Sequence, residues 1–574
     1  MSGDGKEGAS ISGAIVRGNQ SDRTFAGTAR ITSIAVAGWS IPAALFATCI
    51  AAQLYLVFFK SFNWDEYLHY GFFYQMRAGT LELPFQVLHL RALWWAPHVA
   101  TDLLDQMIAA RLFAWSLHLV TLVMIYGVSR QFTNASNSFF ACFAYLTAGY
   151  VFTHGFSIRS DPFAAATLMA ALFLMARGRL TAAKAIAVGA LIGIAGMITL
   201  KAVLYAGCFA GLAWLKVREG SKKVQVMGAI ALLLAASLFV FGVIYSIYAP
   251  NTVEAAEPVE KTSELSFYLR WFSSDLQYGG YIVREVILAP LFFICLLLAP
   301  FSWRKAGLSA DARLALAGFM TPLLALLVYR NTFPYFFVFL LAPLAVAIAP
   351  ALGVVRERYG NAFVAIVLSA TPLALAMLEP RDMIQRQRAL SDYLRQEFPQ
   401  KTGYLDYSGM MPDYPRIIPF LTSGNGMRLY RDQGDPIIAR EIDRGNVPFI
   451  IANQEVLLGA LEGQPMPNNF LPEDLAAIRG NYVRQWGVLW REGTQIPAGS
   501  EKYGFQLRRG GIFALAGEPV TIDGVNIANG SKIMLEKGLH RVSGRRKAPS
   551  TLWRGNQLPT EPPAIPLDSV FTEY

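Results

Sequence analysis

The sequence has few charged residues for its length. Of its 574 residues, 16% are charged and 54% are hydrophobic, whereas about 25% of the residues in an average soluble protein are charged. The deficit is local, because long stretches between Ile31 and Leu378 carry almost no charge while residues 379–574 read like a soluble protein. A soluble core does not need repeated apolar runs of about 20 residues, which is the length that spans a bilayer. The composition therefore indicates an integral membrane protein.

Cysteine and the common signatures of soluble enzymes are also scarce. The four cysteines all lie in apolar runs, at Cys49, Cys142, Cys208 and Cys295. Neither a disulfide framework nor a zinc cluster is therefore indicated in the C-terminal region. That region also lacks an evident P-loop, Ser-His-Asp triad or Cys/His metal motif, and the first polar loop lacks an Asp-x-Asp motif. We predict no metal-ligating residues and no certain cofactor, and a divalent metal ion stays an open alternative.

The excess of basic residues does not indicate a nucleic-acid-binding protein. The formal net charge is +10, but the basic residues form short clusters between apolar runs and not a stripe on a soluble surface. Such clusters are typical of loops that set the orientation of membrane helices. We therefore expect the bilayer as a partner, and no nucleic acid.

The apolar runs predict about eleven transmembrane helices. They lie at approximately residues 31–59, 107–128, 136–153, 163–176, 185–200, 202–215, 226–248, 286–301, 314–329, 335–352 and 361–378. The links between them alternate between a basic set and a set that is acidic, aromatic or longer. Lys and Arg near helix ends are retained in the cytoplasm, so the basic links are expected inside. Eleven crossings then place the C-terminal region outside.

The predicted fold class is an α-helical polytopic membrane protein with a C-terminal extracytoplasmic α/β region and a small β domain. Residues 1–30 are polar and are expected to form a disordered cytoplasmic tail. Short alternating segments broken by glycine predict strands after Tyr503, and the Pro-rich end from Pro559 is expected to be extended or disordered. The predicted parts are the tail at 1–30, a transmembrane catalytic domain at 31–380 with an outer amphipathic loop at 60–106, an α/β region at 381–500, and a β module with a Pro-rich tail at 501–574.

Two adjacent carboxylates follow the first apolar run. The loop begins Ser61-Phe62-Asn63-Trp64-Asp65-Glu66-Tyr67. Carboxylates at a membrane boundary are unfavourable unless they are solvated or used. A wet interfacial pair beside an aromatic belt explains Asp65 and Glu66 as well as a functional role does, and Trp64 and Tyr67 fit either interpretation.

Other polar residues are predicted at the same membrane level. The second outer link contains His154, Arg159 and Asp161, with Pro162 suited to the first turn of the next helix. Lys201 follows the fifth predicted helix, and Arg330 and Tyr335 precede a late one. Each residue alone fits a membrane anchor or a snorkelling side chain. Together they bring two carboxylate sites and three cations to one outer rim.

The order of these motifs resembles the GT-C superfamily of polyprenyl-phosphate-sugar-dependent glycosyltransferases. An Asp-Glu pair after helix one, Arg-x-Asp-Pro before helix four, Lys after helix five and Arg-Asn-x-Phe-Pro-Tyr before a late helix carry the resemblance. It covers roughly residues 31–380. The branch that it is most similar to contains the protein O-mannosyltransferases and the aminoarabinose or galacturonosyl transferases of lipid A.

The resemblance implies an inverting transfer from a polyprenyl-phosphate-sugar donor to an extracytoplasmic glycan, lipid or protein. Such a reaction needs a general base for the acceptor, positive charge for the departing phosphate, and a groove that aligns the two substrates. The implied residues are Asp65 as general base with Glu66 and Asp161 as further catalytic carboxylates; Arg159, Lys201 and Arg330 for the donor phosphate; and Trp64, Tyr67, His154 and Tyr335 for the acceptor or the groove.

Two other functions stay open at this point. A transporter or flippase for a lipid-linked glycan would place its polar residues near the bilayer midplane and show internal repeats, whereas these residues cluster at one face. A non-catalytic scaffold would leave the Asp-Glu pair without a role. We favour the glycosyltransferase, in a bacterial inner membrane with the C-terminus in the periplasm.

Overall fold

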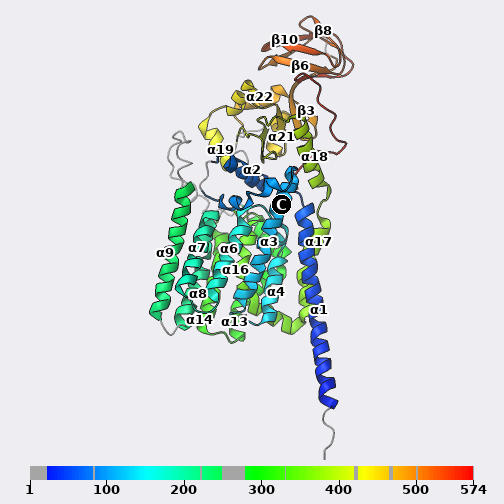
Figure 1. The fold of residues 1–574 in the computed structure, drawn as a ribbon. Coiled ribbons are helices and arrows are strands. Elements are labelled where there is room, and N and C mark those ends of the chain that lie inside the picture. Colours follow the sequence, from blue (N-terminus) through cyan, green and yellow to red (C-terminus); the bar gives the residue numbers. More distant parts are fainter. Residues whose placement is uncertain are drawn as a thin grey trace, which may run out of the picture.

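The helices of the apolar half form one bundle, and the C-terminal half rises from one end of it (Figure 1). The structure is a computed structural model that describes residues 22–81, 85–219, 223–248, 278–329, 331–418, 424–464, 470–499 and 502–572. The bundle contains α1 (Asp22–Phe59), α3 (Leu103–Ser129), α4 (Ala135–Leu146), α5 (Gly149–His154), α6 (Ser160–Ala176), α7 (Ala182–Ile198), η3 (Leu200–Tyr205), α8 (Ala206–Glu219), α9 (Lys223–Tyr248), α12 (Gly279–Leu288), α13 (Pro290–Lys305), α14 (Ala310–Met320), η4 (Thr321–Leu324), α15 (Ala325–Val328), α16 (Phe336–Tyr359) and α17 (Asn361–Leu378).

The predicted helical membrane domain is confirmed, but its number of spans is not. Each of the predicted apolar runs contains helix. In the described residues, seven helices are long and apolar enough to cross a membrane, and the bent pair α12–α13, with a 94° angle, brings the number to eight. The helices Ser160–Ala176 and Ala182–Ile198 are apolar but shorter. The number eleven therefore stays a prediction that counts these shorter helices as crossings.

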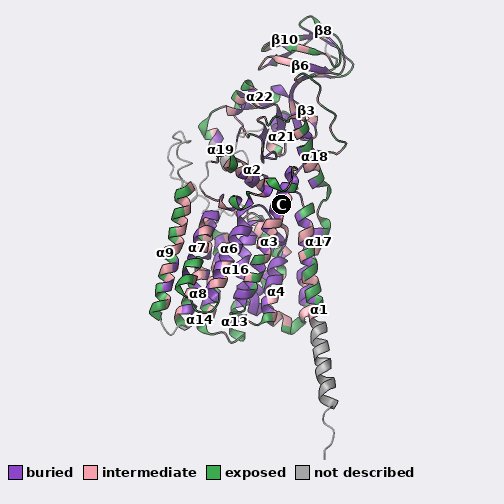
Figure 2. Cartoon of the chain, viewed as in Figure 1, coloured by how far each residue is buried: buried purple, intermediate pink, exposed green. Residues whose placement is uncertain are grey.

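Helix α16 forms the centre of the bundle. All of its residues from Phe336 to Gly353 are buried (Figure 2). Its Pro343 cannot donate a helical bond to the carbonyl of Phe339, and the Tyr205 hydroxyl donates to that carbonyl at 2.7 Å instead. A backbone group inside a bundle needs such a partner because lipid offers none. The bond also fixes α16 beside η3, which precedes α8.

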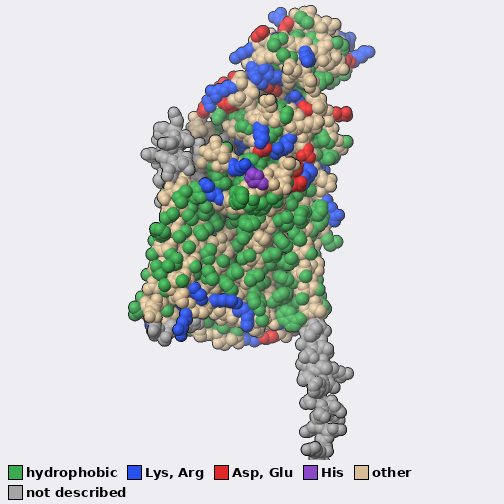
Figure 3. Space-filling model, in the orientation of Figure 1, with side chains coloured by type: hydrophobic (Ala, Val, Ile, Leu, Met, Phe, Trp, Pro, Cys, Tyr) green, Lys and Arg blue, Asp and Glu red, His purple; other side chains and the backbone are tan. Residues whose placement is uncertain are grey.

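The basic turns lie at one end of the bundle. Lys216 Nζ donates to the carbonyl of Ala176 at 2.8 Å, and Arg218 Nε lies 3.4 Å from Asp311 Oδ2. Arg356 donates to the side chain of Asn137. Lys and Arg side chains border the apolar band at this end of the bundle (Figure 3). The alternation of links read from the sequence therefore corresponds to two chemically different ends.

The other end is covered by the loop between α1 and α3. It contains α2 (Trp64–Ala78) and two 3₁₀ turns, η1 (Leu88–Leu93) and η2 (Ala96–His98). These elements lie across the ends of the bundle helices, beneath the C-terminal region (Figure 1). The loop is therefore a short layer between the apolar bundle and the polar half of the chain.

The C-terminal half begins with α18 (Asp382–Glu397). The elements that follow are β1 (Leu405–Asp406), α19 (Gly424–Gln433), α20 (Ile437–Arg444), β2 (Phe449–Ile451), α21 (Glu455–Leu461), α22 (Pro472–Asn481), β3 (Tyr482–Trp486), β4 (Leu489–Ile496), β5 (Lys502–Leu507), β6 (Gly511–Ala516), β7 (Val520–Ile522), β8 (Val525–Ile527), β9 (Lys532–Leu535), β10 (Gly538–Ser543) and β11 (Ser550–Arg554). One sheet has the order β1-β2-β4-β11-β6-β9, with β3 paired to β4, and a second has the order β5-β10-β7-β8.

The first sheet runs through both predicted C-terminal parts. Strand β4 lies before residue 500 and β11 lies after it, and they pair antiparallel with Ser550 opposite Ile496. The α/β region and the β module have separate apolar cores, whereas α18, Phe449 and Leu489 join the core of the bundle. The α/β region and the β module are thus linked by the hydrogen bonds between β4 and β11 as well as by the continuous chain.

Candidate active site

The turn between α1 and α2 places two adjacent carboxylates in the first helical turn of α2. The N-cap residue Asn63 accepts a bond from the Glu66 N–H at 3.0 Å, and Glu66 Oε2 accepts from the Asn63 N–H at 3.3 Å. This reciprocal capping box starts the helix at Trp64. Successive residues on a helix point about 100° apart. Asp65 and Glu66 therefore face different neighbours.

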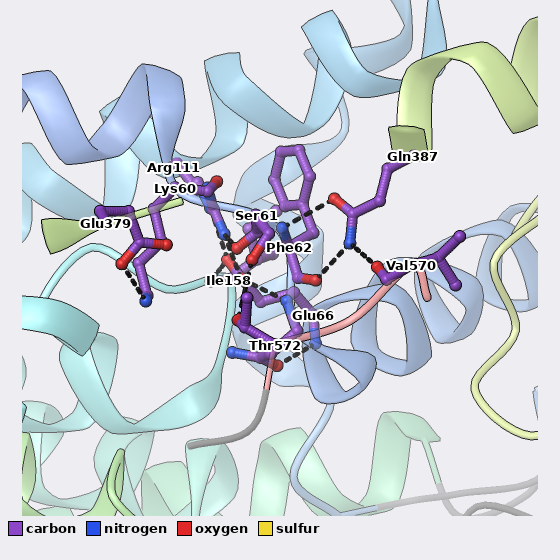
Figure 4. A network of polar contacts seen from close by, with 11 residues as sticks. Lys60, Ser61, Phe62, Glu66, Arg111, Ile158, Glu379, Gln387, Val570 and Thr572 are labelled. Carbon is purple, nitrogen blue, oxygen red and sulfur yellow. Dashed lines mark hydrogen bonds and ion pairs between the residues drawn. The ribbon is translucent and has the colours of Figure 1, made fainter. Parts of the chain in front are cut away.

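Glu66 points into the protein and binds Arg111 of α3. Arg111 Nε donates to Glu66 Oε1 at 2.8 Å, and the N–H of Ile158 donates to the same oxygen at 3.2 Å. Arg111 also donates to the carbonyls of Lys60 at 2.6 Å and Ser61 at 2.9 Å (Figure 4). Glu66 and Arg111 are each 1% exposed. Glu66 is thus engaged in holding the α1–α2 turn against α3.

The Asp65 side chain points away from Arg111, toward Arg159, and is the first member of a series of alternating charges. Arg159 Nη1 lies 2.6 Å from Asp65 Oδ2, and Arg159 Nε lies 3.6 Å from Asp161 Oδ2. Asp161 also binds Lys201 Nζ. Two carboxylates and two cations from α2, the start of α6 and η3 therefore form one array in which the formal charges balance.

Local structure explains the position of each member of this array. Arg159 is the N-cap residue of α6, and Asp161 lies in the first turn, where a carboxylate is favoured by the helix dipole. Thr199, which caps η3, accepts a bond from the Lys201 N–H at 3.4 Å. The three charges are thus held at helix starts at the end of the bundle that carries α2.

Burial differs sharply among the three predicted catalytic carboxylates. The side chain of Asp65 is 19% exposed, whereas those of Asp161 and Glu66 are 0% and 1% exposed. A buried ion pair is strongly destabilised when one partner is removed, by about 3–5 kcal/mol. Removal of either Asp161 or Lys201 alone is therefore expected to destabilise the fold. Asp65 is the member of the set that a molecule outside the bundle reaches most directly.

Aromatic rings surround the cations. The guanidinium of Arg159 lies 3.2 Å from the ring centroid of Tyr335, and Lys201 Nζ lies 5.4–5.9 Å from the centroids of the rings at Tyr329, Phe336 and Phe339. Cation–π contacts of this kind gain strength where water is excluded. On the other side, Trp64 packs edge-to-face against Tyr407 of the C-terminal half, with centroids 5.9 Å apart.

The structure brings together most of the residues predicted from the sequence, but not all. Asp65, Arg159, Asp161, Lys201 and Tyr335 form one connected group, with Trp64 beside it. Tyr67 is buried between Phe62 and Phe571, and His154 is buried with Nδ1 2.8 Å from Thr153 Oγ1. The roles of Tyr67 and His154 stay predictions. Arg330 lies outside the described residues, so its role stays a prediction.

Sequence reasoning missed several residues at this end of the bundle. Arg111 had a usable signal, because a lone arginine in an apolar run marks a buried partner. His69 of α2 and His89 of η1 lie with ring centroids 5.2 Å apart. Burial, together with the charge of Arg159, lowers the pKa of both histidines, that of His89 to about 3. Tyr407 and Gln387 had no signal, since they are about 340 and 320 residues from the turn.

No metal centre emerges from the described part of the chain. Within it, no group of three or more His, Cys, Asp or Glu side chains is arranged to hold a metal ion. The charge array has its own counterions in Arg159 and Lys201. A divalent metal stays an open alternative for any site that includes residues outside the described ranges.

The chain matches known proteins at the level of solved structures, and not at the level of family models or curated sequences. No protein-family model matches the chain, and no curated protein sequence matches it. The chain is similar to ArnT from Cupriavidus metallidurans, solved with undecaprenyl phosphate, at 15% identity and a TM-score of 0.45, covering 71% of this chain and 81% of that one.

A second similarity is to the oligosaccharyltransferase AglB from Archaeoglobus fulgidus, solved with an inhibitory peptide and a dolichol-phosphate. The identity is 11% and the TM-score 0.48, covering 87% of this chain and 76% of that one. The Archaeoglobus fulgidus oligosaccharyltransferase solved with Zn and sulfate matches at 11% identity and a TM-score of 0.47, covering 86% and 75%.

Proposed function

We propose that this chain is a membrane glycosyltransferase that moves a sugar from a polyprenyl-phosphate-linked donor to an extracytoplasmic acceptor, with inversion at the anomeric carbon. The observation that carries the proposal is the array of Asp65, Arg159, Asp161 and Lys201 at the polar end of an apolar bundle. A lipid-linked donor keeps its prenyl chain in the bilayer and its phosphate at the interface. An acidic and basic array at that level suits both the phosphate and the acceptor.

Asp65 is the general base in this proposal. It is the most accessible of the three carboxylates, and its neighbour Glu66 is already engaged with Arg111. A base must reach the acceptor hydroxyl directly or through one water molecule. Asp65 removes the acceptor proton as the oxygen attacks the anomeric carbon, while the bond from that carbon to the phosphate oxygen breaks on the opposite face.

Arg159 and Lys201 receive the negative charge of the departing phosphate. An arginine can bind two phosphate oxygens at once, whereas a lysine acts as a point charge. Arg159 touches Asp65 at Nη1 and lies near Asp161 at Nε. A phosphate that draws Nη1 away from Asp65 therefore exposes the base as the donor binds. This exchange links donor binding to the readiness of the carboxylate, and Arg330 is the third candidate cation.

The acceptor occupies the side of Asp65 that faces the C-terminal half. Trp64 and Tyr407 bound that side, and aromatic faces suit the C–H surfaces of a sugar ring. Placed there, an acceptor hydroxyl lies opposite the donor phosphate, as in-line displacement requires. We further propose that the enzyme resides in a bacterial inner membrane, with this site and the C-terminal half in the periplasm.

The test uses purified full-length protein in liposomes with a panel of radiolabelled undecaprenyl-phosphate sugars. Asp65→Asn should lower transfer about 10²–10⁴-fold, the usual contribution of a general base, and should retain binding of undecaprenyl phosphate. Asp382→Asn is the matched control, because Asp382 also pairs with an arginine, Arg386 at 2.7 Å, but lies on α18 away from the array.

Two results would contradict the proposal. Full transfer by Asp65→Asn would exclude that carboxylate as the base. Movement of the lipid-linked sugar across the bilayer without any transfer product, by the parent protein, would favour a flippase instead.

A further inference from the structure

The chain returns to the α1–α2 turn after the β module. Beyond β11, residues 555–572 run back beside α18 toward the bundle (Figure 1). The carbonyl of Ile565 accepts a bond from Trp486 Nε1 at 3.0 Å, and that of Leu567 accepts from the Val488 N–H at 2.9 Å. Leu567 and Val570 are each 1% exposed and belong to the apolar core of the bundle. The Pro-rich segment, expected to be extended or disordered, therefore packs against the rest of the chain.

Gln387 of α18 joins this segment to the turn. Its Nε2 donates to the carbonyl of Val570 at 2.8 Å and to that of Phe62 at 2.7 Å. Its Oε1 accepts a bond from the Phe62 N–H at 2.9 Å (Figure 4). Gln387 is fully buried, and these bonds use both hydrogens of its amide group. The side chain thus forms a three-way junction between α18, the turn and residue 570.

The last described residues reinforce this junction. Ser61 Oγ lies 3.1 Å from Thr572 Oγ1, and the ring of Phe571 packs edge-to-face on Tyr67 at 6.0 Å. Ser61 belongs to the turn and Tyr67 to the first turns of α2. The returning segment thus contacts residues on both sides of Asp65 in sequence.

The turn is consequently held from two directions. Residues between two helices have backbone groups without helical partners. On the bundle side, Arg111 binds the carbonyls of Lys60 and Ser61. On the outer side, Gln387 binds both backbone groups of Phe62. The direction of α2, and with it the carboxylate of Asp65, depends on both supports.

We propose that Gln387 and residues 565–572 act as a positioning device for the base Asp65. This inference rests on the proposed function, because it assigns the device a role in transfer. Gln387 acts through the α1–α2 turn and touches neither substrate. Without the support of Gln387 and residues 565–572, the Asp65 carboxylate is no longer held in line with the acceptor oxygen. A displacement of about 1 Å can lower a rate about 10²-fold. The cations of the donor phosphate site, Arg159 and Lys201, lie on α6 and η3 and keep their positions in the fold.

The first test replaces the amide by an apolar group of similar length. Gln387→Met should lower kcat about 10–100-fold, a range set by that displacement, while binding of undecaprenyl phosphate is retained. Hydrogen exchange at the amides of residues 60–66 should accelerate. Gln53→Met is the matched control, because Gln53 of α1 is also fully buried and bonds the carbonyl of Phe152 at 3.0 Å, away from the turn. It should change neither kcat nor the exchange of residues 60–66.

The second test removes the returning segment and supplies it again. Deletion of residues 565–574 should accelerate exchange at residues 60–66 and lower kcat. A synthetic peptide of residues 563–574, added in trans, should restore both, whereas the same peptide with Val570→Asp should not. Thermal unfolding of each variant verifies that the bundle is folded, and the peptide rescue keeps the inference testable if Gln387→Met does not fold.

The outcomes separate this inference from the proposed function. Unchanged exchange at residues 60–66 in both variants would overturn the positioning device, as would accelerated exchange with unaltered kcat. If the parent protein transfers no sugar from any donor, the proposed function fails and the role of the device in transfer falls with it. A parent that transfers sugar while Gln387→Met and the deletion keep full kcat would overturn the device alone.

Discussion

Arg111 Nε donates to Glu66 Oε1 at 2.8 Å while its Nη2 donates to Oε2 of the same carboxylate, and both side chains are almost completely buried. The pair connects α3 to the first turn of α2. The same guanidinium also binds two carbonyls of the turn that leads to Asp65. Glu66, which forms the buried ion pair, and Asp65, the candidate base, therefore lie in the same helical turn of α2 but have different roles.

Replacing Arg111 should destabilise the protein more than replacing both members of the pair. Arg111→Met leaves the Glu66 carboxylate buried without its partner, which should lower the free energy of unfolding by about 3–5 kcal/mol. Glu66→Leu combined with Arg111→Met removes both charges and should recover part of that loss. Thermal unfolding in detergent measures both. Equal melting temperatures for the single and double variants would contradict the buried charge as the cause.

Tyr407 should contribute to acceptor affinity. Its ring is edge-to-face with Trp64 at 5.9 Å, one residue from the proposed base. Its loop is fixed because Asp406 accepts bonds from the N–H groups of Gly409 and Met410 at 2.8 Å. Tyr407→Ala should raise the KM for acceptor several-fold and leave binding of undecaprenyl phosphate unaltered, while Tyr407→Phe should resemble the parent. An unchanged acceptor KM in Tyr407→Ala would remove this residue from the site.

His89 should make the protein less stable in mild acid. Burial lowers its pKa in the folded state from 6.5 to about 3, so below pH 6.5 the unfolded chain binds a proton that the folded protein does not. Stability is therefore greatest above pH 6.5 and falls as the pH decreases toward 3, by up to about 1.4 kcal/mol per pH unit for one such group. Melting temperatures at pH 7.5 and 5.5 measure the loss. His89→Phe should reduce it, and an undiminished loss in that variant would assign the effect to other groups.

The two ends of the bundle should react differently with a membrane-impermeant maleimide in intact cells. The four native cysteines are buried, so a single introduced thiol reports its own side. Lys537→Cys in the exposed β9–β10 turn should be labelled from outside, and Glu357→Cys, exposed near the end of α16, should be labelled after cell lysis alone. Labelling of both positions in intact cells would contradict the proposed sidedness.

The polar end of the bundle could be predicted in outline because its signals are local. Asp65 follows an apolar run directly, and Arg159 and Asp161 lie in a short polar link before the next run. A segment that must span lipid as a helix fixes the depth of the residues at its ends. The predicted membrane depth alone therefore placed four residues at one level: Asp65, Arg159, Asp161 and Lys201. In the structure these residues form a chain of ion pairs.

The partners of these residues could not be predicted in the same way. Tyr67 was predicted at the depth of the array, but its ring packs against Phe571 near the end of the chain. Direction around a helix axis depends on which neighbour the helix packs against, and that neighbour is set by tertiary contacts. The predicted membrane depth of Asp65 and Glu66 is the same, so it gave no reason to choose Asp65 as the base. The structure distinguishes them, because Glu66 is buried and Asp65 is partly exposed.

The sequence by itself determined the membrane class, the positions of the apolar helices and the end of the bundle at which the charges gather, because hydrophobicity and span length are properties of continuous segments. The tertiary structure decided which cation meets which carboxylate and how the α1–α2 turn is held. Gln387 binds Phe62 across 325 positions of sequence, and Arg111 reaches Glu66 across 45. Such contacts depend on the folding of distant segments against one another, and no local pattern encodes them.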